Sequence, residues 1–299
     1  MGRSGTTVLE RSLGTDERVV SLGEVTHLWE RSLQLDELCG CGEPFSVCPF
    51  WIDVGERAFG GWNTIDPDRV LALKRRVDRT LRTPQLAFRL GRRSWRREVD
   101  EYVDLYAKLY QAASEVADAD VVIDSSKNAS LPWVLRLDDR IDLRVLHCVR
   151  DSRAVAYAWT KKVVRPEARD AGGELMHQYS PSTLALKWMQ HNLVVEALRL
   201  RRTKSERLRY EDWANDPVDG VRRVRELAGL DGPPPASKVA HDWVQLDKAH
   251  TCSGNPMRFE VGRVDIRRDE TWKSSFPARS RRLVTLLTAP FLIAYRYPA

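Results

Sequence analysis

The sequence predicts an α/β protein in which a central parallel sheet is flanked by helices on both faces, giving three layers. Three apolar segments have the composition of buried strands, namely residues 121–123, 143–149 and 208–213. A helical pattern follows each of them, as in the right-handed βαβ units of parallel sheets. With 299 residues, of which 42% are hydrophobic, the chain is long enough to form one domain over residues 1–299. We expect a loop and helical insertion rich in Cys and Trp at about residues 36–116.

The charge of the chain predicts small anionic partners. The formal net charge is +6 and the pI is near 9.1, but much of the basic character comes from dispersed arginines rather than lysine-rich blocks. This distribution favours small anionic ligands and counts against nucleic acid. The sequence has no apolar run long enough to cross a membrane and no leader-like start, so we expect no membrane span and a cytoplasmic location. Nothing in it indicates the oligomeric state.

The chain begins with small and hydroxyl-bearing residues directly before a helical segment at 7–13, which ends at Gly14. Free peptide N–H groups and the positive end of the helix dipole favour an anion at such a corner. The segment is like the second half of a phosphate-binding loop, with Thr6 where the lysine usually stands. The missing lysine counts against ordinary ATP or GTP hydrolysis. The alternative is a flexible N-terminal tail. The candidate anion-binding residues are Arg3, Ser4, Gly5, Thr6 and Thr7.

Polar residues follow the predicted strands where the chain turns into the next helix. Glu24 follows a short strand at 19–23, and His27 lies one helical turn further on. Lys127 closes the polar cluster after the strand at 121–123, and Arg150 follows the strand at 143–149. In parallel α/β sheets these junctions line the ligand crevice, so we expect the four side chains at one edge of the sheet.

Three of the five cysteines lie close together in the sequence, at Cys39, Cys41 and Cys48. With His27 or Cys252 they could hold a metal ion, but Cys-x-Cys followed by a single later Cys is not a usual zinc spacing. We therefore prefer a loop packed by its thiols and aromatic side chains, and we expect no metal.

Four motifs in the same order resemble the sulfotransferases that use 3′-phosphoadenosine 5′-phosphosulfate (PAPS). They are Gly-Arg-Ser-Gly-Thr-Thr at 2–7, Asp-Ser-Ser-Lys at 124–127, Val-Arg-Asp-Ser-Arg-Ala-Val-Ala-Tyr at 149–157 and Tyr-Glu-Asp-Trp at 210–213. The chain resembles bacterial members most and, more distantly, tyrosylprotein and carbohydrate sulfotransferases. The resemblance implies a P-loop-like fold whose first strand precedes the loop. Because Met1 stands almost at the loop, we expect that strand to be missing from this sequence.

The resemblance also implies a donor site. Residues 3–7 would hold the 5′-phosphosulfate, Arg150 the 3′-phosphate, and Tyr210 would pack near the adenine. Arg258 resembles a basic residue of the late loop and is a second candidate for the 3′-phosphate. The family usually has a serine where this chain has Ala158, and we expect Ser152 to compensate.

For the chemistry, the resemblance implies that Lys127 neutralises the bridging oxygen as the sulfuryl group leaves. Glu24 would act as the general base, with His27 as the alternative. The acceptor would be a small-molecule or carbohydrate hydroxyl, and the reaction needs no metal.

Two other functions remain open at this point. One is a kinase-like phosphotransferase that uses ATP and Mg²⁺, which the missing loop lysine disfavours. The other is an inactive nucleotide- or polyanion-binding protein of the same fold, which Ala158 favours.

Overall fold

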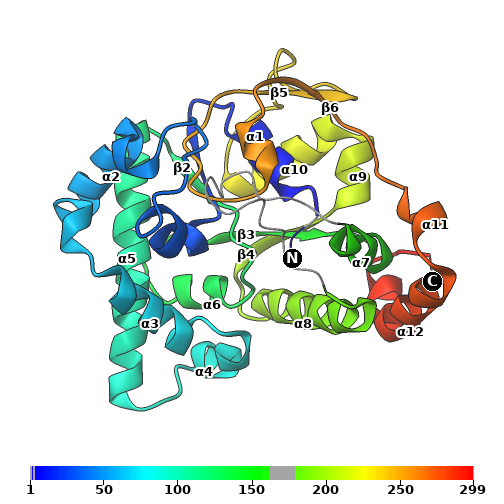
Figure 1. Cartoon of the computed structure of the whole chain (residues 1–299), viewed down its shortest axis with the longest axis horizontal. Coiled ribbons are helices and arrows are strands. Elements are labelled where there is room, and N and C mark those ends of the chain that lie inside the picture. Colours follow the sequence, from blue (N-terminus) through cyan, green and yellow to red (C-terminus); the bar gives the residue numbers. More distant parts are fainter. Residues whose placement is uncertain (1, 3, 162–178, 299) are drawn as a thin grey trace.

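The computed structural model describes residues 2, 4–161 and 179–298, and in them strands and helices alternate as the sequence predicts (Figure 1). The strands are β1 (Val19–Gly23), β2 (Val121–Asp124), β3 (Arg144–Val149), β4 (Lys204–Arg209), β5 (Trp243–Leu246) and β6 (Gly262–Asp265). The helices are α1 (Thr6–Leu13), α2 (Pro49–Phe59), α3 (Pro67–Val77), α4 (Thr83–Phe88), α5 (Arg93–Ala117), α6 (Leu131–Leu135), α7 (Ser152–Thr160), α8 (Pro181–Arg199), α9 (Tyr210–Asn215), α10 (Pro217–Ala228), α11 (Trp272–Ser275) and α12 (Ala278–Ala294).

The strands form three separate pairs. β1 is parallel to β2, with Val19 opposite Val121, and β3 is parallel to β4, with Arg144 opposite Lys204. β5 and β6 are antiparallel. The α/β class and the parallel pairing agree with the sequence prediction, but the single central sheet does not form. In the part of the chain that the structure describes, β2 and β3 belong to different pairs and no strand joins them.

Three segments differ from their sequence prediction. Residues 210–213 open α9 instead of continuing a strand, because Glu211 and Asp212 place acidic charge in the first turn of a helix, where it is favourable. The segment after Glu24 is a 3-10 turn (Val25–His27) and a π turn (Leu28–Ser32) rather than a regular helix. The expected long loop contains α2, which has Pro49 at its first position.

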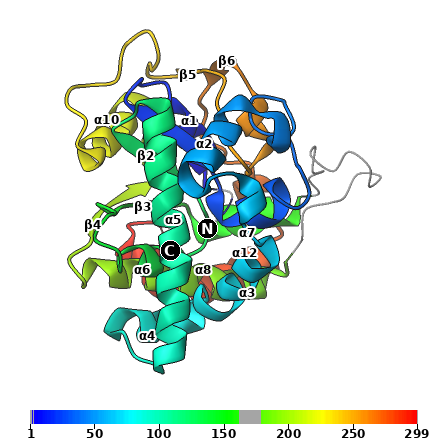
Figure 2. The same ribbon diagram turned by 90° about the vertical axis from the view of Figure 1, so that its left-hand side faces the viewer.

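Three hydrophobic cores support the strand pairs. The largest lies between β1, β2 and the group α2 to α6, and buries Trp29, Trp51 and Tyr106 completely. A second lies between α1, β4, α9, α10 and β5, and a third joins α7, α8 and α12. Figures 1 and 2 show α2 to α5 gathered on one side of the molecule, with the long α5 running across the edge formed by β2. Within the described residues, no helix combines the length and the apolar character needed to span a bilayer.

Helix α1 lies in the interior and is anchored by two buried charged residues. The Glu10 carboxylate accepts hydrogen bonds from Ser21 Oγ at 2.6 Å and from the Gly23 N–H at 2.9 Å. The Arg11 guanidinium donates to the carbonyls of Met257, Arg258 and Glu260 at 2.9, 2.9 and 2.7 Å, and to that of Asp247. Helix α1 is thereby fixed to β1 on one side and to the 247–260 segment on the other.

Replacing Arg11 with Met tests this anchor. The variant leaves four carbonyl oxygens without their donor, so we expect the free energy of unfolding to fall by roughly 3 kcal/mol or more. Urea unfolding followed by circular dichroism measures the loss. The control is Arg18→Met, which removes an exposed ion pair with Asp16 and should cost under about 1 kcal/mol. Equal losses in the two variants would contradict the anchoring role of Arg11.

Candidate functional site

Glu24, His27 and Lys127 come together where β1 and β2 end. One carboxylate oxygen of Glu24 lies 3.4 Å from Lys127 Nζ, and the other lies 3.7 Å from His27 Nε2. The Glu24 and Lys127 side chains retain only 16% and 18% of their exposure, while His27 retains 30%. The structure therefore brings the three candidate catalytic residues into one cluster with its imidazole toward solvent.

Asp124, at the end of β2, holds both arms of this cluster. Its carboxylate accepts hydrogen bonds from the N–H groups of Val25 and Ser126 at 3.3 and 2.7 Å, and from Tyr110 Oη at 2.6 Å. Val25 follows Glu24 and Ser126 precedes Lys127, so a single buried carboxylate fixes the backbone beside each of them. The Lys127 ammonium also donates to the Ser125 carbonyl.

The charges of the cluster keep Glu24 ionised. Burial alone raises the pKa of a carboxyl group, but the positive charges of Lys127, His27 and Arg31 outweigh burial and hold the pKa of Glu24 below its usual value. Glu10 lies on the α1 side of Lys127 and has the opposite balance, because burial raises its pKa more than Lys127 and its hydrogen bonds lower it. Lys127 is thus the shared counter-charge of two carboxyl groups.

A second cluster lies where β3 and β4 end. The guanidinium of Arg150 is buried and lies over the ring of Tyr210, 4.3 Å from its centroid. Arg150 Nη2 donates to the Asp269 carboxylate at 3.1 Å and to the Asp269 carbonyl at 3.2 Å. The Asp269 N–H donates to the hydroxyl of Tyr210 at 3.3 Å. An oxyanion already sits on the cation that we expect to bind phosphate.

The N-terminal loop touches this second cluster through Gly5. Gly5 has a φ of 70°, and a Cβ at this position would lie only 2.7 Å from the ring of Tyr210. A residue with a side chain would therefore push the loop away from Tyr210. Thr6 and Thr7 begin α1, whose Glu10 reaches the first cluster, so the loop and α1 connect the two clusters. Ser4 is buried beside Gly5.

Two of the expected cofactor-binding residues serve other contacts. The hydroxyl of Ser152 is buried and lies 2.7 Å from Thr288 Oγ1, so it links α7 to α12. Arg258 is 1% exposed and donates to the carbonyls of Thr251 and Leu38 at 2.7 and 2.6 Å. Both expectations are corrected, because these side chains are buried in contacts between chain segments. Arg3 lies outside the described residues.

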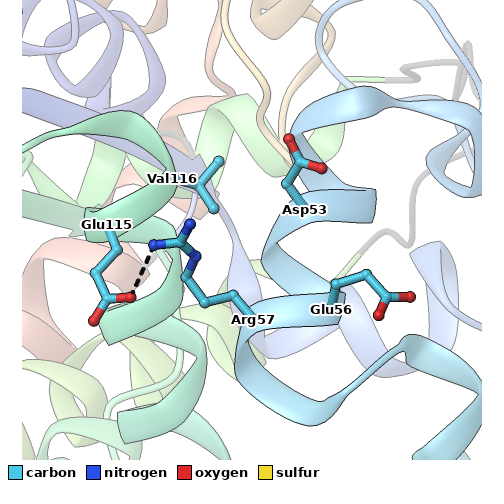
Figure 3. A pocket seen from close by; sticks show the side chains of 5 residues that line it. All are labelled: Asp53, Glu56, Arg57, Glu115 and Val116. Carbon is cyan, nitrogen blue, oxygen red and sulfur yellow. Dashed lines mark hydrogen bonds and ion pairs between the residues drawn. The ribbon is translucent and has the colours of Figure 1, made fainter.

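Sequence reasoning missed Glu10, Asp124 and Asp269. Glu10 stands in an amphipathic pattern where a charged residue is normally solvated, and Asp124 was visible only as part of a motif. Asp269 is 119 residues from Arg150, and no local pattern connects them. A surface hollow between α2 and α5 has no link to either cluster. It is lined by an exposed ion pair of Arg57 with Glu115 at 3.2 Å, and by Asp53, Glu56 and Val116 (Figure 3).

Comparisons with known proteins give a distant relationship to sulfotransferases. The sequence matches no protein-family model. Over 171 residues it is 26% identical to human carbohydrate sulfotransferase 3, which covers 54% of this chain and 34% of the relative. The mouse protein of the same name is 25% identical over 171 residues, and again only about a third of its length, 35%, is covered. These matches confirm the resemblance to sulfotransferases that the motifs indicate.

Among solved structures, the chain is similar to a sulfotransferase domain from the curacin biosynthetic pathway. The TM-score is 0.49 and the identity 15%, over 99% of this chain and 96% of that chain. This likeness is too weak to relate individual residues of the two proteins.

Asp78, at the end of α3, supports the loop that carries Lys127. Its carboxylate accepts a hydrogen bond from Asn128 Nδ2 at 2.7 Å and one from Tyr102 Oη at 3.4 Å. Burial raises the pKa of Asp78 to about 6, against partial compensation by its hydrogen bonds and Lys74. A raised pKa favours the protonated folded state, so the stabilising contribution is complete at low pH and is lost as the pH rises through about 6.

Asp78→Asn should therefore remove part of the pH dependence of stability. Relative to the wild type, we expect the variant to gain up to roughly 3 kcal/mol between about pH 4 and about pH 7, because Asn need not ionise. Urea unfolding across this pH range measures the difference. Asp100→Asn, at an exposed position of α5, serves as the control and should follow the wild type. Parallel pH profiles for wild type and Asp78→Asn would refute the assignment.

Proposed function

We propose that this protein transfers a sulfuryl group from PAPS to a hydroxyl group of a carbohydrate or another small acceptor. The observation that carries the proposal is the pairing of Lys127 with Glu24 beside a loop and helix whose Gly5 contacts Tyr210. A cation next to a base, with a separate buried guanidinium nearby, suits a donor that has two anionic groups. The names of the two curated relatives support sulfuryl transfer and a carbohydrate acceptor.

The donor would lie along the loop between the two clusters. The peptide N–H groups of residues 4–7, with the hydroxyls of Thr6 and Thr7, are suited to the 5′-phosphosulfate at the start of α1. Arg150 would hold the 3′-phosphate in a bidentate contact. Its present partner Asp269 belongs to an exposed segment and can give way to a phosphate, which is the stronger acceptor. Tyr210 would then offer its ring to the adenine.

In the transfer step, Glu24 takes the proton of the acceptor hydroxyl while its oxygen attacks sulfur. The bond between sulfur and the phosphate oxygen breaks, and adenosine 3′,5′-bisphosphate leaves with the electron pair. Lys127 compensates the charge that develops on that oxygen. His27 contacts the second oxygen of Glu24 and so orients the carboxylate. Because Lys127 keeps Glu24 ionised, the base is ready before the donor binds, and the cation can then turn to the leaving group.

Binding of adenosine 3′,5′-bisphosphate tests the donor site. At a concentration of about a hundred times Kd it should stabilise the fold by about 2.7 kcal/mol, visible as a rise in Tm. Arg150→Gln should weaken binding roughly tenfold to a hundredfold, since a hydrogen bond to a charged group is lost. The control is Arg140→Gln, which lies in an exposed ion pair with Asp138 and Asp104 and should bind as the wild type does.

Failure of the bisphosphate to stabilise the wild type would refute the proposed donor. Stabilisation by ATP only in the presence of Mg²⁺ would instead favour a phosphotransferase.

Glu24→Gln and Lys127→Met test the chemistry. Loss of the base should lower kcat about a hundredfold or more, and loss of the cation should have an effect of similar size. Transfer of labelled sulfate from PAPS to polysaccharides, monosaccharides and phenols measures kcat and identifies the acceptor class. Binding of adenosine 3′,5′-bisphosphate to Glu24→Gln should stay within a few-fold of the wild type. Product binding with no transfer to any acceptor would support the inactive binding protein, and unchanged kcat in both variants would exclude their assigned roles.

A further inference from the structure

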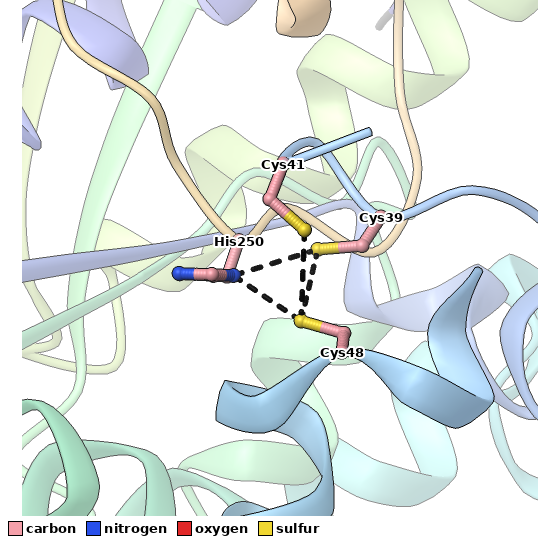
Figure 4. Close-up of side chains that lie close together, drawn as sticks. All are labelled: Cys39, Cys41, Cys48 and His250. Atoms are coloured by element: carbon pink, nitrogen blue, oxygen red, sulfur yellow. Dashed lines mark hydrogen bonds between the residues drawn. The ribbon is translucent and has the colours of Figure 1, made fainter. Parts of the chain in front are cut away.

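Three cysteines and a histidine form a tight cluster away from the residues of the proposed reaction. Cys39 and Cys48 are fully buried, while Cys41 and His250 are partly buried. Figure 4 shows the three sulfur atoms and the imidazole pointing toward one another. All four potential ligand atoms lie within 4.8 Å of each other.

The distances match the edges of a metal-centred tetrahedron. Cys48 Sγ lies 3.6 Å from Cys39 Sγ and 3.7 Å from Cys41 Sγ. His250 Nδ1 lies 3.2 Å from Cys48 Sγ and 3.8 Å from Cys39 Sγ. A zinc ion with bonds of about 2.3 Å to sulfur and about 2.0 Å to nitrogen would separate sulfur pairs by about 3.8 Å and sulfur from nitrogen by about 3.5 Å. All five cysteines of the chain are free thiols, so these contacts are not disulfides.

The backbone is built to present two of the thiols from one turn. The Gly42 N–H donates to the Cys39 carbonyl and the Cys39 N–H donates to the Glu43 carbonyl, each at 2.8 Å, which closes a turn around Cys41. Gly40 lets this turn approach the segment that carries His250, because a Cβ there would lie 2.3 Å from Thr251 Oγ1. The Gly40 N–H donates to the Thr251 carbonyl at 2.9 Å and fixes the approach.

The other two ligands are also held in place. Cys48 directly precedes α2, where the helix dipole favours a thiolate. The imidazole of His250 stacks on Phe50, with ring centroids 5.1 Å apart and planes inclined by 18°. This stacking leaves Nδ1 directed at the sulfur atoms. Each ligand therefore has a defined orientation, as a metal site requires.

We propose that Cys39, Cys41, Cys48 and His250 bind one zinc ion as a structural site. Thiolate and imidazole donors in a tetrahedron select zinc among the common divalent metals. Four protein ligands leave no position for a substrate, so the ion would act by cross-linking the turn at 39–42 to the segment around residue 250. The sequence analysis preferred packed thiols because its candidate fourth ligands were His27 and Cys252. His27 instead pairs with Glu24, and the fourth ligand is more than 200 residues away, at His250.

The cross-link has a consequence for the neighbouring site. The segment after His250 joins β1, since the Cys252 N–H donates to the Leu22 carbonyl at 2.8 Å. The Glu24 N–H in turn donates to the Ser253 carbonyl at 3.1 Å. Loss of the metal should therefore loosen both the 39–48 region and the backbone that positions Glu24.

Metal content is the direct test. Protein purified under reducing conditions without added metal should contain one zinc ion per chain by inductively coupled plasma mass spectrometry. Cys41→Ser, at the partly buried ligand, should lower zinc affinity at least about a hundredfold. The control is Cys148→Ser, at a thiol of β3 outside the cluster, which should keep the full complement. A wild type that neither contains zinc nor binds added Zn²⁺, or equal zinc binding by Cys41→Ser and the wild type, would overturn the proposal.

Cobalt substitution of the wild type provides a test that does not depend on how a variant folds. Co²⁺ bound by three thiolates in a tetrahedral site gives a strong sulfur-to-metal charge-transfer band and intense visible bands, and Zn²⁺ should abolish both. Chelation should lower Tm, and Zn²⁺ but not Mg²⁺ should restore it. A weak octahedral spectrum, or fewer than the five thiols titrating in the denatured reduced-handled protein because a disulfide has formed within the cluster, would contradict the zinc site.

Discussion

The arrangement of the molecule depends on how α1 is held in its interior. Glu10 and Arg11 are adjacent in the sequence and buried, yet they point to different partners. Glu10 binds the end of β1, and Arg11 binds four carbonyls of the 247–260 segment. Because β1 with β2 and β3 with β4 form separate pairs in the described residues, no sheet hydrogen bonds align the two halves of the site. The contacts of α1 take over this task, and they place the N-terminal loop between Lys127 on one side and Tyr210 on the other.

The charges of the site follow from the same constraint. Glu10 and Glu24 lie on opposite sides of Lys127, and a single ammonium group cannot neutralise both fully. Glu24 also has His27 and Arg31 nearby and remains ionised, whereas burial dominates at Glu10 and raises its pKa. The pair that would perform proton transfer and leaving-group stabilisation is therefore the charged one. The neighbouring buried carboxyl serves mainly as a hydrogen-bond acceptor for β1.

The sequence predicted the local features of this structure well and the distant contacts poorly. Periodicity located α1, α5, α8 and the three inner parallel strands, because each depends on residues a few positions apart. The junction rule brought Glu24 and Lys127 together correctly. Arg258 was misread because a basic residue in an irregular, Gly-containing loop suggests solvent, and only the fold reveals that it is buried against Thr251 and Leu38. His250 escaped for the same reason, since its partners lie more than 200 residues earlier.

Arg258 connects the two proposals in structural terms. It donates to Leu38, which precedes Cys39, and to Thr251, which follows His250, so it spans the base of the zinc cluster. Its own carbonyl accepts from Arg11 of α1. A continuous series of buried polar contacts thus runs from the N-terminal helix to the Cys–His cluster, through segments that have little regular secondary structure. Irregular backbone cannot stabilise itself by repeated hydrogen bonding, and here buried guanidinium groups and a metal ion take that role. Since the same 250–253 segment binds the Glu24 N–H, the position of the proposed base depends on contacts far from the strands that carry it.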